Sequence, residues 1–268
     1  MIAFALAATL AAADPACRGG MVDVGDYGLH TTIEGEGPVA VVFESGNGND
    51  GTVWADMAAR LAGRGYTSLR YDRAGLGQSA PRPGDAYDVD NEVAALRGLM
   101  DRCGVEGPVL IVAHSYGGMI ATLMAARDPR VKALLMLDAT NAGTENPARI
   151  EKLLTLSRAR YQELRDYDRD LAAHIIPLME AWGDTAAKAR AAAIPDEIPI
   201  YLLVRGIAGS PDDDLEEWQS GMAAFAAGGP RRYMVVAPGM GHKVAAERPD
   251  WVEASALQLL DYIERNAD

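Results

Sequence analysis

The 268-residue sequence has little positive charge, few cysteines and, after its first residues, no long apolar run. Its 25 lysines and arginines are outnumbered by 38 aspartates and glutamates, which gives a net charge of -13, and they form no dense cluster. Such a charge repels phosphate backbones and anionic lipids, which argues against nucleic acid as a partner. No segment after residue 13 approaches the ~18 uncharged apolar residues of a transmembrane helix, so integral membrane association is not expected.

The N-terminal end contains a short apolar stretch and one of the 2 cysteines. Residues 1–13 are too few to span a bilayer, lie where a signal peptide would, and contain no Lys or Arg. We assign residues 1–20 as a candidate leader, with a mis-set start or a buried helix as alternatives. A working signal peptide predicts a periplasmic or secreted protein, and otherwise the protein is cytoplasmic. Cys17 and Cys103 fit either one disulfide or two free thiols.

Length and composition indicate a single globular domain over residues 21–268. Apolar residues make up 49% and charged residues 24% of the sequence, as in ordinary folded proteins. Single α/β domains commonly reach roughly 200 to 250 residues. The sequence has no internal repeat, and its one biased tract is the acidic turn at 212–214.

Apolar periodicity predicts an α/β fold with a doubly wound, mostly parallel sheet. Residues 22–34 alternate polar and apolar, which predicts one or two exposed antiparallel strands. Mostly apolar runs, typical of strands buried on both faces, follow at 39–43, 68–71, 109–113, 133–137, 200–204 and 233–237. Helix-period segments alternate with them at 52–63, 89–103, 116–127, 215–227 and 251–265. Such a sheet carries its ligand crevice at the carboxyl ends of the strands.

One helical, charge-rich stretch at 139–197 interrupts this alternation and is too long for a single crossover. It predicts a lid of several short helices over the crevice, with residues 149–170 as the longest member. The alternative is an excursion with a purely structural role.

Ser115 is the candidate nucleophile because it lies between a predicted strand and a predicted helix, in Ala113-His114-Ser115-Tyr116-Gly117-Gly118. A serine on such a strained elbow presents its hydroxyl to the crevice at a helix N-terminus, with small residues two positions before and after it. The leading position is Ala113 where Gly is usual, and Ala is still small. The alternative is a serine in an ordinary turn.

A serine hydroxyl needs a base, and the sequence has 4 histidines. His30 falls in the predicted N-terminal hairpin, strand alternation directs His114 away from the crevice, and His174 falls in the lid. His242 follows the last predicted strand, whose carboxyl end faces the same crevice as Ser115. We therefore assign His242 as the general base.

An acyl-transfer site also requires donors for the developing oxyanion. The glycine-rich turn after Phe43 provides Asn47 as one candidate backbone donor, and Tyr116, directly after the nucleophile, provides the other. Gly46, Gly48 and His114 flank these donors and are the candidate substrate-binding positions. The alternatives for this turn are a flexible loop or a phosphate cradle, but no P-loop lysine or dinucleotide spacing accompanies it, and we predict no metal site.

Together these segments resemble the α/β-hydrolase superfamily over nearly the whole chain from residue 22. The motifs that carry the resemblance are Gly46-Asn47-Gly48, Asp72-Arg73-Ala74-Gly75-Leu76-Gly77-Gln78-Ser79, the Ser115 elbow, and Gly241-His242 followed by Glu247-Arg248-Pro249. The resemblance implies an eight-stranded, mostly parallel sheet, a helical cap inserted after strand six at about 141–196, and Ser-His-acid catalysis without a cofactor. Ser45 stands where the family's oxyanion turn usually has His.

The resemblance places the acid in one of two positions. Most members carry it after strand seven, where this sequence offers no acid before Asp212, Asp213 and Asp214. Some carry it after strand six, where Asp138 directly follows the apolar run. Asp138 fits the order Ser, Asp, His, and we favour it over the 212–214 turn and over Glu145. A helix N-cap is its structural alternative.

These assignments predict a serine hydrolase that cleaves a carboxylic ester, or a related acyl bond, of a small, largely apolar substrate. A C–C bond hydrolase, a hydroxynitrile lyase or an acyltransferase would use the same residues, and a non-catalytic small-molecule receptor would keep the pocket. Ser115 argues against the dehalogenases and epoxide hydrolases of this fold, which have Asp there. The sequence carries no signal for an oligomeric state.

Overall fold

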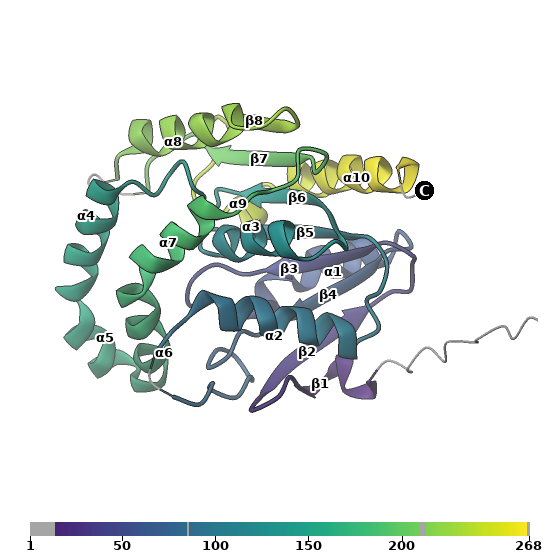
Figure 1. Ribbon diagram of the computed structural model, residues 1–268, viewed down its shortest axis with the longest axis horizontal. Helices are drawn as coiled ribbons and strands as arrows, with labels where there is room; N and C mark the ends of the chain where they lie inside the picture. Colours follow the sequence, from purple (N-terminus) through teal and green to yellow (C-terminus); the bar gives the residue numbers. More distant parts are fainter. Residues whose placement is uncertain (1–13, 85, 210–212, 267–268) are drawn as a thin grey trace, which may run out of the picture.

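The computed structural model describes residues 14–84, 86–209 and 213–266 (Figure 1). Its centre is one eight-stranded sheet with the strand order β1-β2-β4-β3-β5-β6-β7-β8. β1 pairs antiparallel with β2 and β2 antiparallel with β4, and every other pairing is parallel. The strands are β1 (Arg18–Asp23), β2 (Gly28–Glu34), β3 (Ala40–Glu44), β4 (Thr67–Tyr71), β5 (Val109–His114), β6 (Val131–Leu137), β7 (Ile200–Arg205) and β8 (Arg232–Ala237). The predicted α/β fold class is confirmed.

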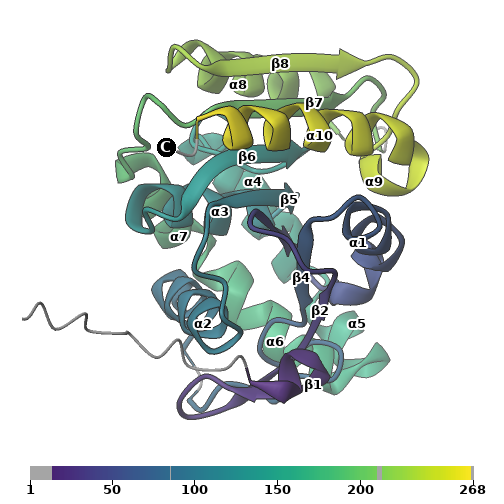
Figure 2. The same ribbon diagram turned by 90° about the vertical axis from the view of Figure 1, so that its right-hand side faces the viewer.

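Helices cover both faces of the sheet because the inner strands are apolar on both sides. In β3, Val42 packs into the cluster beneath α2, α3 and α8, whereas Val41 and Phe43 pack toward α1 and α10. Figure 2 shows α1 and α10 on one side of the sheet and α2 and α3 on the other. These helices are α1 (Ala55–Ala62), α2 (Val89–Arg102), α3 (Gly117–Arg127), α8 (Leu215–Ala227) and α10 (Pro249–Arg265), and short helical turns lie at η1 (Pro15–Cys17), η2 (Gly51–Trp54) and α9 (Val244–Glu247).

β8 departs from the expected burial on both faces. Tyr233 and Val235 are 53% and 47% exposed, because β8 is the last strand of the sheet. Tyr233 packs edge-on against Tyr201 of the neighbouring β7, with ring centroids 5.4 Å apart.

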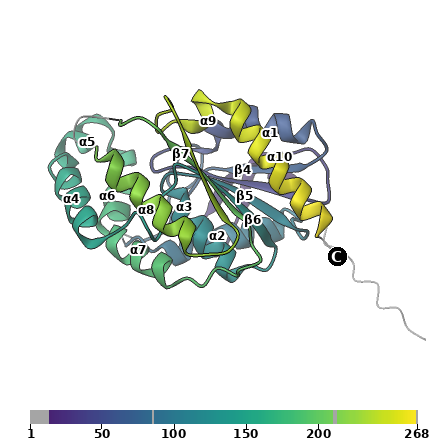
Figure 3. The same ribbon diagram turned by 90° about the horizontal axis from the view of Figure 1, so that it is seen from above.

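A four-helix insertion connects β6 to β7, and Figure 3 shows it gathered at the end of the molecule opposite the C-terminus. The expectation of one long helix over 149–170 is wrong. The first helix ends at Arg158, and Asp168 has extended backbone (φ -152°) and accepts hydrogen bonds from the N–H groups of Asp170 and Leu171, so a new helix begins there. The insertion comprises α4 (Pro147–Arg158), α5 (Tyr161–Tyr167), α6 (Arg169–Glu180) and α7 (Trp182–Ala191).

The N-terminal part of the described chain is joined to α2 by a Cys17–Cys103 disulfide, which resolves the two alternatives for these cysteines. The bond spans 86 residues of sequence, and cross-linking a loop of that size stabilises a fold by about 4 to 5 kcal/mol in the chain-entropy model. β1 begins at Arg18, so the last residues of the 1–20 segment assigned to a leader form part of the sheet. Residues 1–13 of that segment lie outside the described residues.

Candidate active site

Ser115 occupies a strained turn between β5 and α3. Its φ is 51°, in the left-handed region that residues other than glycine rarely adopt. The turn fits because its neighbours are small: Ala113 is fully buried, and a Cβ atom on Gly117 would lie 2.7 Å from the Glu44 carbonyl oxygen. The turn therefore tolerates Ala at the leading position and requires Gly two residues after the serine.

Ser115, His242 and Asp138 form one hydrogen-bonded chain. His242 lies in the loop after β8, and its Nε2 is 3.1 Å from Ser115 Oγ. Its Nδ1 is 2.6 Å from Asp138 Oδ2. Asp138 follows β6 directly, is fully buried, and has a φ of 42° that turns its carboxylate along the strand ends toward the loop. With Nδ1 donating to the carboxylate, Nε2 is left to accept the serine proton.

Two residues that the sequence analysis did not identify complete the surroundings of Asp138. The Trp218 indole N–H of α8 donates to Asp138 Oδ1 at 2.6 Å, and the Arg205 backbone N–H donates to the same oxygen at 3.2 Å. The Arg205 guanidinium lies 3.6 Å from the other oxygen. The pairing of β7 beside β6 could have indicated Arg205, because it ends the neighbouring strand. Nothing in the sequence pattern indicated Trp218.

The other candidate acids have different partners. Asp213 accepts from the Arg205 guanidinium at 2.6 Å and from the Gly209 N–H at 2.7 Å. Asp214 accepts from the Glu217 N–H at 2.9 Å and so begins α8. Among the described residues, none of the candidates Asp213, Asp214 and Glu145 makes a hydrogen bond or ion pair with His242. Asp212 lies outside the described residues.

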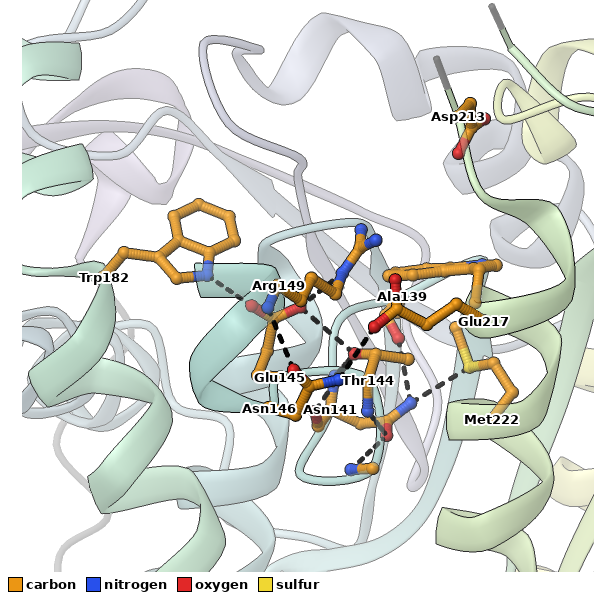
Figure 4. Close-up of polar contacts among 12 residues, drawn as sticks. Ala139, Asn141, Thr144, Glu145, Asn146, Arg149, Trp182, Asp213, Glu217 and Met222 are labelled. Carbon is orange, nitrogen blue, oxygen red and sulfur yellow. Dashed lines mark hydrogen bonds and ion pairs between the residues drawn. The ribbon is translucent and has the colours of Figure 1, made fainter. Parts of the chain in front are cut away.

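Glu145 is a buried anchor at the start of the insertion (Figure 4). Its carboxylate accepts from the Trp182 indole N–H at 2.7 Å and from the Thr144 hydroxyl at 3.3 Å, and it lies 3.5 Å from the Arg149 guanidinium. Its backbone carbonyl accepts from the Arg190 guanidinium at 2.5 Å. These contacts join the first residues of the insertion to its last helix, and Figure 4 shows Asp213 apart from them.

The glycine-rich turn after β3 lies directly against the elbow. A Cβ atom on Gly46 would lie 3.2 Å from Ser115 Cβ, so only glycine lets the backbone come this close. The Arg73 guanidinium donates to the carbonyls of Ser45 and Gly46 at 2.6 and 2.7 Å, and to Glu44 Oε1 at 2.7 Å. Burial raises the pKa of Glu44, while the charge of Arg73 opposes that rise. A buried ion pair thus fixes the carbonyl directions of the turn.

The Ser45 side chain, which replaces the family's usual His, has a structural role in the same turn. Its hydroxyl donates to the Asp50 carbonyl at 3.0 Å and accepts from the Trp54 indole N–H at 3.0 Å. The amide side chain of Asn47 points to α6, where its Nδ2 lies 3.5 Å from Met179 Sδ. The side chain of Asn47 is therefore turned toward the insertion.

The position of His114 differs from the expectation that its ring points away from the crevice. The ring lies beside the site. It lies on the α10 face of the sheet, as strand alternation requires, but the His242 loop crosses that same face. His114 Nε2 lies 2.8 Å from the His242 carbonyl oxygen, and the two rings are 4.6 Å apart. Burial, together with repulsion from His242, lowers the pKa of His114 to about 4, so this ring is neutral beside the base.

The remaining predicted positions lie around this core. A Cβ atom on Gly48 would lie 3.5 Å from Ile175 Cδ1, so Gly48 faces α6. Tyr116 is fully buried, and its hydroxyl lies 2.5 Å from that of Tyr87. His30 is part of the β1–β2 hairpin and lies 3.5 Å from Asp72.

The described residues contain neither a metal cluster nor a membrane-spanning helix. Among those residues, no group of three or more His, Cys, Asp or Glu side chains is arranged to hold a metal ion. In the same part of the chain, no helix combines the length and the apolar character needed to cross a membrane.

The chain is similar to known proteins in sequence and in fold. Over 115 residues the chain is 37% identical to lipase LipV of Mycobacterium tuberculosis, covering 41% of each protein. Over 99 residues it is 31% identical to a carbendazim hydrolyzing esterase of Nocardioides sp., covering 37% of this chain and 40% of the esterase. The chain thus spans about two fifths of the length of these relatives.

The similarity in fold extends much further along the chain. The structure of an enol-lactonase from Burkholderia xenovorans LB400 superposes with a TM-score of 0.61 at 20% identity, over 90% of this chain and 99% of that one. The model of the alpha/beta hydrolase family matches residues 41–255, well over half of the sequence. The chain therefore belongs to the alpha/beta hydrolase family.

Proposed function

We propose that this protein is a serine hydrolase that cleaves a carboxylic ester, or a related acyl bond, of a small and largely apolar substrate. One observation carries the proposal: Asp138, His242 and Ser115 are joined by contacts of 2.6 and 3.1 Å, in the order that acyl transfer requires. Membership of the hydrolase family, and relatives named as a lipase and an esterase, agree with this chemistry.

In the proposed reaction, His242 Nε2 removes the proton of Ser115 Oγ as that oxygen attacks the substrate carbonyl. Asp138 stabilises the imidazolium that forms. The backbone N–H groups of Asn47 and Tyr116 hold the developing oxyanion, because the glycine-rich turn and the start of α3 both adjoin Ser115. His242 returns its proton to the leaving alcohol, and water activated by His242 then hydrolyses the acyl-enzyme.

The insertion is proposed as a helical cap over about residues 141–196, and it supplies the apolar part of the site. Leu171 and Ile175 of α6 face Gly48, and Met179 contacts Asn47, so an apolar helix face lies over the oxyanion turn. Such a wall favours an acyl or alcohol group without charge.

The same residues would serve a C–C bond hydrolase, a hydroxynitrile lyase or an acyltransferase, and a non-catalytic receptor would keep the pocket. No contact in the described residues favours one of these alternatives. The small ester is therefore the first substrate to test.

A fluorophosphonate probe tests the proposal directly. Intact-mass analysis should show one adduct on the parent protein and none on Ser115→Ala, with hydrolysis of p-nitrophenyl butyrate lost in the same variant. Ser157→Ala, in the insertion helix α4, is the matched control and should label fully. Adduct formation on Ser115→Ala, or ester hydrolysis by it, would refute Ser115 as the nucleophile. Labelling without hydrolysis of any ester in a chain-length series would favour the other acyl or C–C chemistries.

A further inference from the structure

A cavity of about 790 Å³ lies between the core and the insertion, and neither Ser115, His242 nor Asp138 lines it. Its core wall includes Gly75, Ser79, Arg82 and Tyr87, which follow β4, and Glu92 of α2. Its other wall is one stripe of α6, comprising Asp170, Ala173, His174 and Pro177. The volume is within the range of roughly 300 to 1,000 Å³ that small-molecule sites occupy.

Glu92 is the unusual group in this cavity. It is only 4% exposed, yet no hydrogen bond or ion pair from the described residues reaches its carboxylate. Burial raises the pKa of Glu92 to about 7, although the charge of Arg73 opposes that rise. A buried carboxylate without a partner is costly to the fold, which makes it a candidate for contact with a ligand.

The opposite wall presents a second acceptor. Pro177 lies inside α6 and has no N–H, so the carbonyl of Ala173, four residues earlier, loses its helical donor. Both residues line the cavity, and Asp170 lies one turn before Ala173. On the core wall, the Ser79 hydroxyl donates to the Asp72 carbonyl, and one guanidinium nitrogen of Arg82 donates to the Ala86 carbonyl. The charged side chains that line the cavity are Glu92, Asp170 and Arg82, so negative charge is in excess.

We propose that this cavity binds a small organic amine, with its ammonium group against Glu92. An ammonium carries three donors and one positive charge, which match the Glu92 carboxylate, the Ala173 carbonyl and this excess of negative charge. The net charge of -13 favours cations at the surface as well.

The site adjoins the Ser115 turn. Tyr87 lines the cavity, and its hydroxyl lies 2.5 Å from that of Tyr116, the residue directly after the nucleophile. The proposal does not depend on catalysis by Ser115, because occupancy is measured without turnover.

Calorimetric titration of the full chain with n-butylammonium chloride, 1-butanol and butyrate tests the proposal. We expect the ammonium ion to bind and its neutral and anionic counterparts not to bind. Glu92→Gln keeps the size of the side chain and should weaken ammonium binding by about tenfold or more, as expected for loss of a charged hydrogen bond. Glu216→Gln, at an exposed position of α8, is the matched control and should bind like the parent. Thermal unfolding of both variants checks that they remain folded.

Proton release provides a second readout, made on the parent protein alone. An ammonium ion favours the charged form of Glu92, so binding at pH 6 should expel a proton, seen as a binding enthalpy that depends on the ionisation enthalpy of the buffer. The charged and titratable groups that act on Glu92, or line the cavity with it, are Tyr27, Glu44, Tyr71, Arg73, Arg82, Tyr87, Tyr116, Asp170 and His174. Equal binding of 1-butanol, ammonium binding without proton release, unchanged affinity in Glu92→Gln, or no ammonium binding at all would each overturn the proposal.

Discussion

The hydrogen bond from Trp218 to Asp138 gives the sharpest test of how the site is held. Trp218→Phe removes the indole N–H that lies 2.6 Å from Asp138 Oδ1 and keeps an aromatic ring in the same buried place. The ring has packing roles of its own, because the guanidiniums of Arg205 and Arg149 lie 5.2 and 4.8 Å from its centroid. Phenylalanine preserves much of that packing, so the variant isolates the donor.

The size of the effect follows from the donors that remain. A hydrogen bond to a charged group contributes about 1.5 to 3 kcal/mol. Asp138 still accepts from His242 and from the Arg205 N–H, so its carboxylate is not left unpaired. We therefore expect a loss near the lower end, about 1.4 kcal/mol of transition-state stabilisation, which is about a tenfold fall in kcat/KM. The fall should be in kcat, with KM nearly unchanged, because Trp218 contacts the acid and not the proposed acyl site.

Steady-state hydrolysis of p-nitrophenyl butyrate and the rate of fluorophosphonate labelling measure this effect. Two other tryptophans are matched controls. Trp251→Phe removes an indole that packs on Arg248, and Trp182→Phe removes the same kind of donor from Glu145. Both should keep activity within about twofold of the parent. Parent-like labelling by Trp218→Phe, or an equal loss in Trp182→Phe, would refute the view that Trp218 acts through Asp138.

Two further predictions concern the acid and the pH dependence of stability. Asp138→Asn should lower kcat by about a thousandfold or more, because the amide no longer fixes the imidazole tautomer, whereas Asp213→Asn should cost less than about tenfold; the opposite ranking in an ester assay would contradict the assignment. Burial lowers the pKa of His174 to about 4 from an unfolded value of 6.5, so the unfolded chain binds the extra proton first as pH falls. Protonation of this group in the unfolded chain should lower the free energy of unfolding by about 2 kcal/mol between pH 7 and pH 5. Urea unfolding at the two pH values should show that His174→Gln removes this part of the loss.

The sequence was most informative where local physics determines the structure. The small residues around Ser115 are needed because its positive φ brings the turn against Glu44 and the β3 turn, and that requirement is visible as the Gly117-Gly118 pair. Apolar runs predicted the inner strands because a parallel sheet with helices on both faces leaves them no polar side. β8 has similar composition, but its place at the sheet edge is a matter of topology.

Long-range contacts were not predictable in the same way. Trp218 is 80 residues from Asp138 in sequence, and nothing local distinguishes it from a core tryptophan. His114 was misjudged for a related reason: alternation gave the correct face of the sheet, but not the path of the His242 loop over that face. The break of 149–170 into α4, α5 and α6 depends on the cap at Asp168, a common residue type whose backbone conformation the periodicity does not show.

The position of Asp138 makes the start of the insertion important for the site. Because Asp138 lies at the end of β6, the insertion begins directly after the proposed acid. Its first residues are fixed: the Thr140 N–H donates to the Ser115 carbonyl at 2.9 Å, and Asn141, Thr144 and Glu145 are buried. In contrast, α4 and α5 contain no buried residue. The buried start of the insertion therefore holds Asp138 against His242 and Trp218 without a buried residue from these two outer helices. An acid at this junction stays in position because the residues directly after it are buried and hydrogen-bonded to the Ser115 turn.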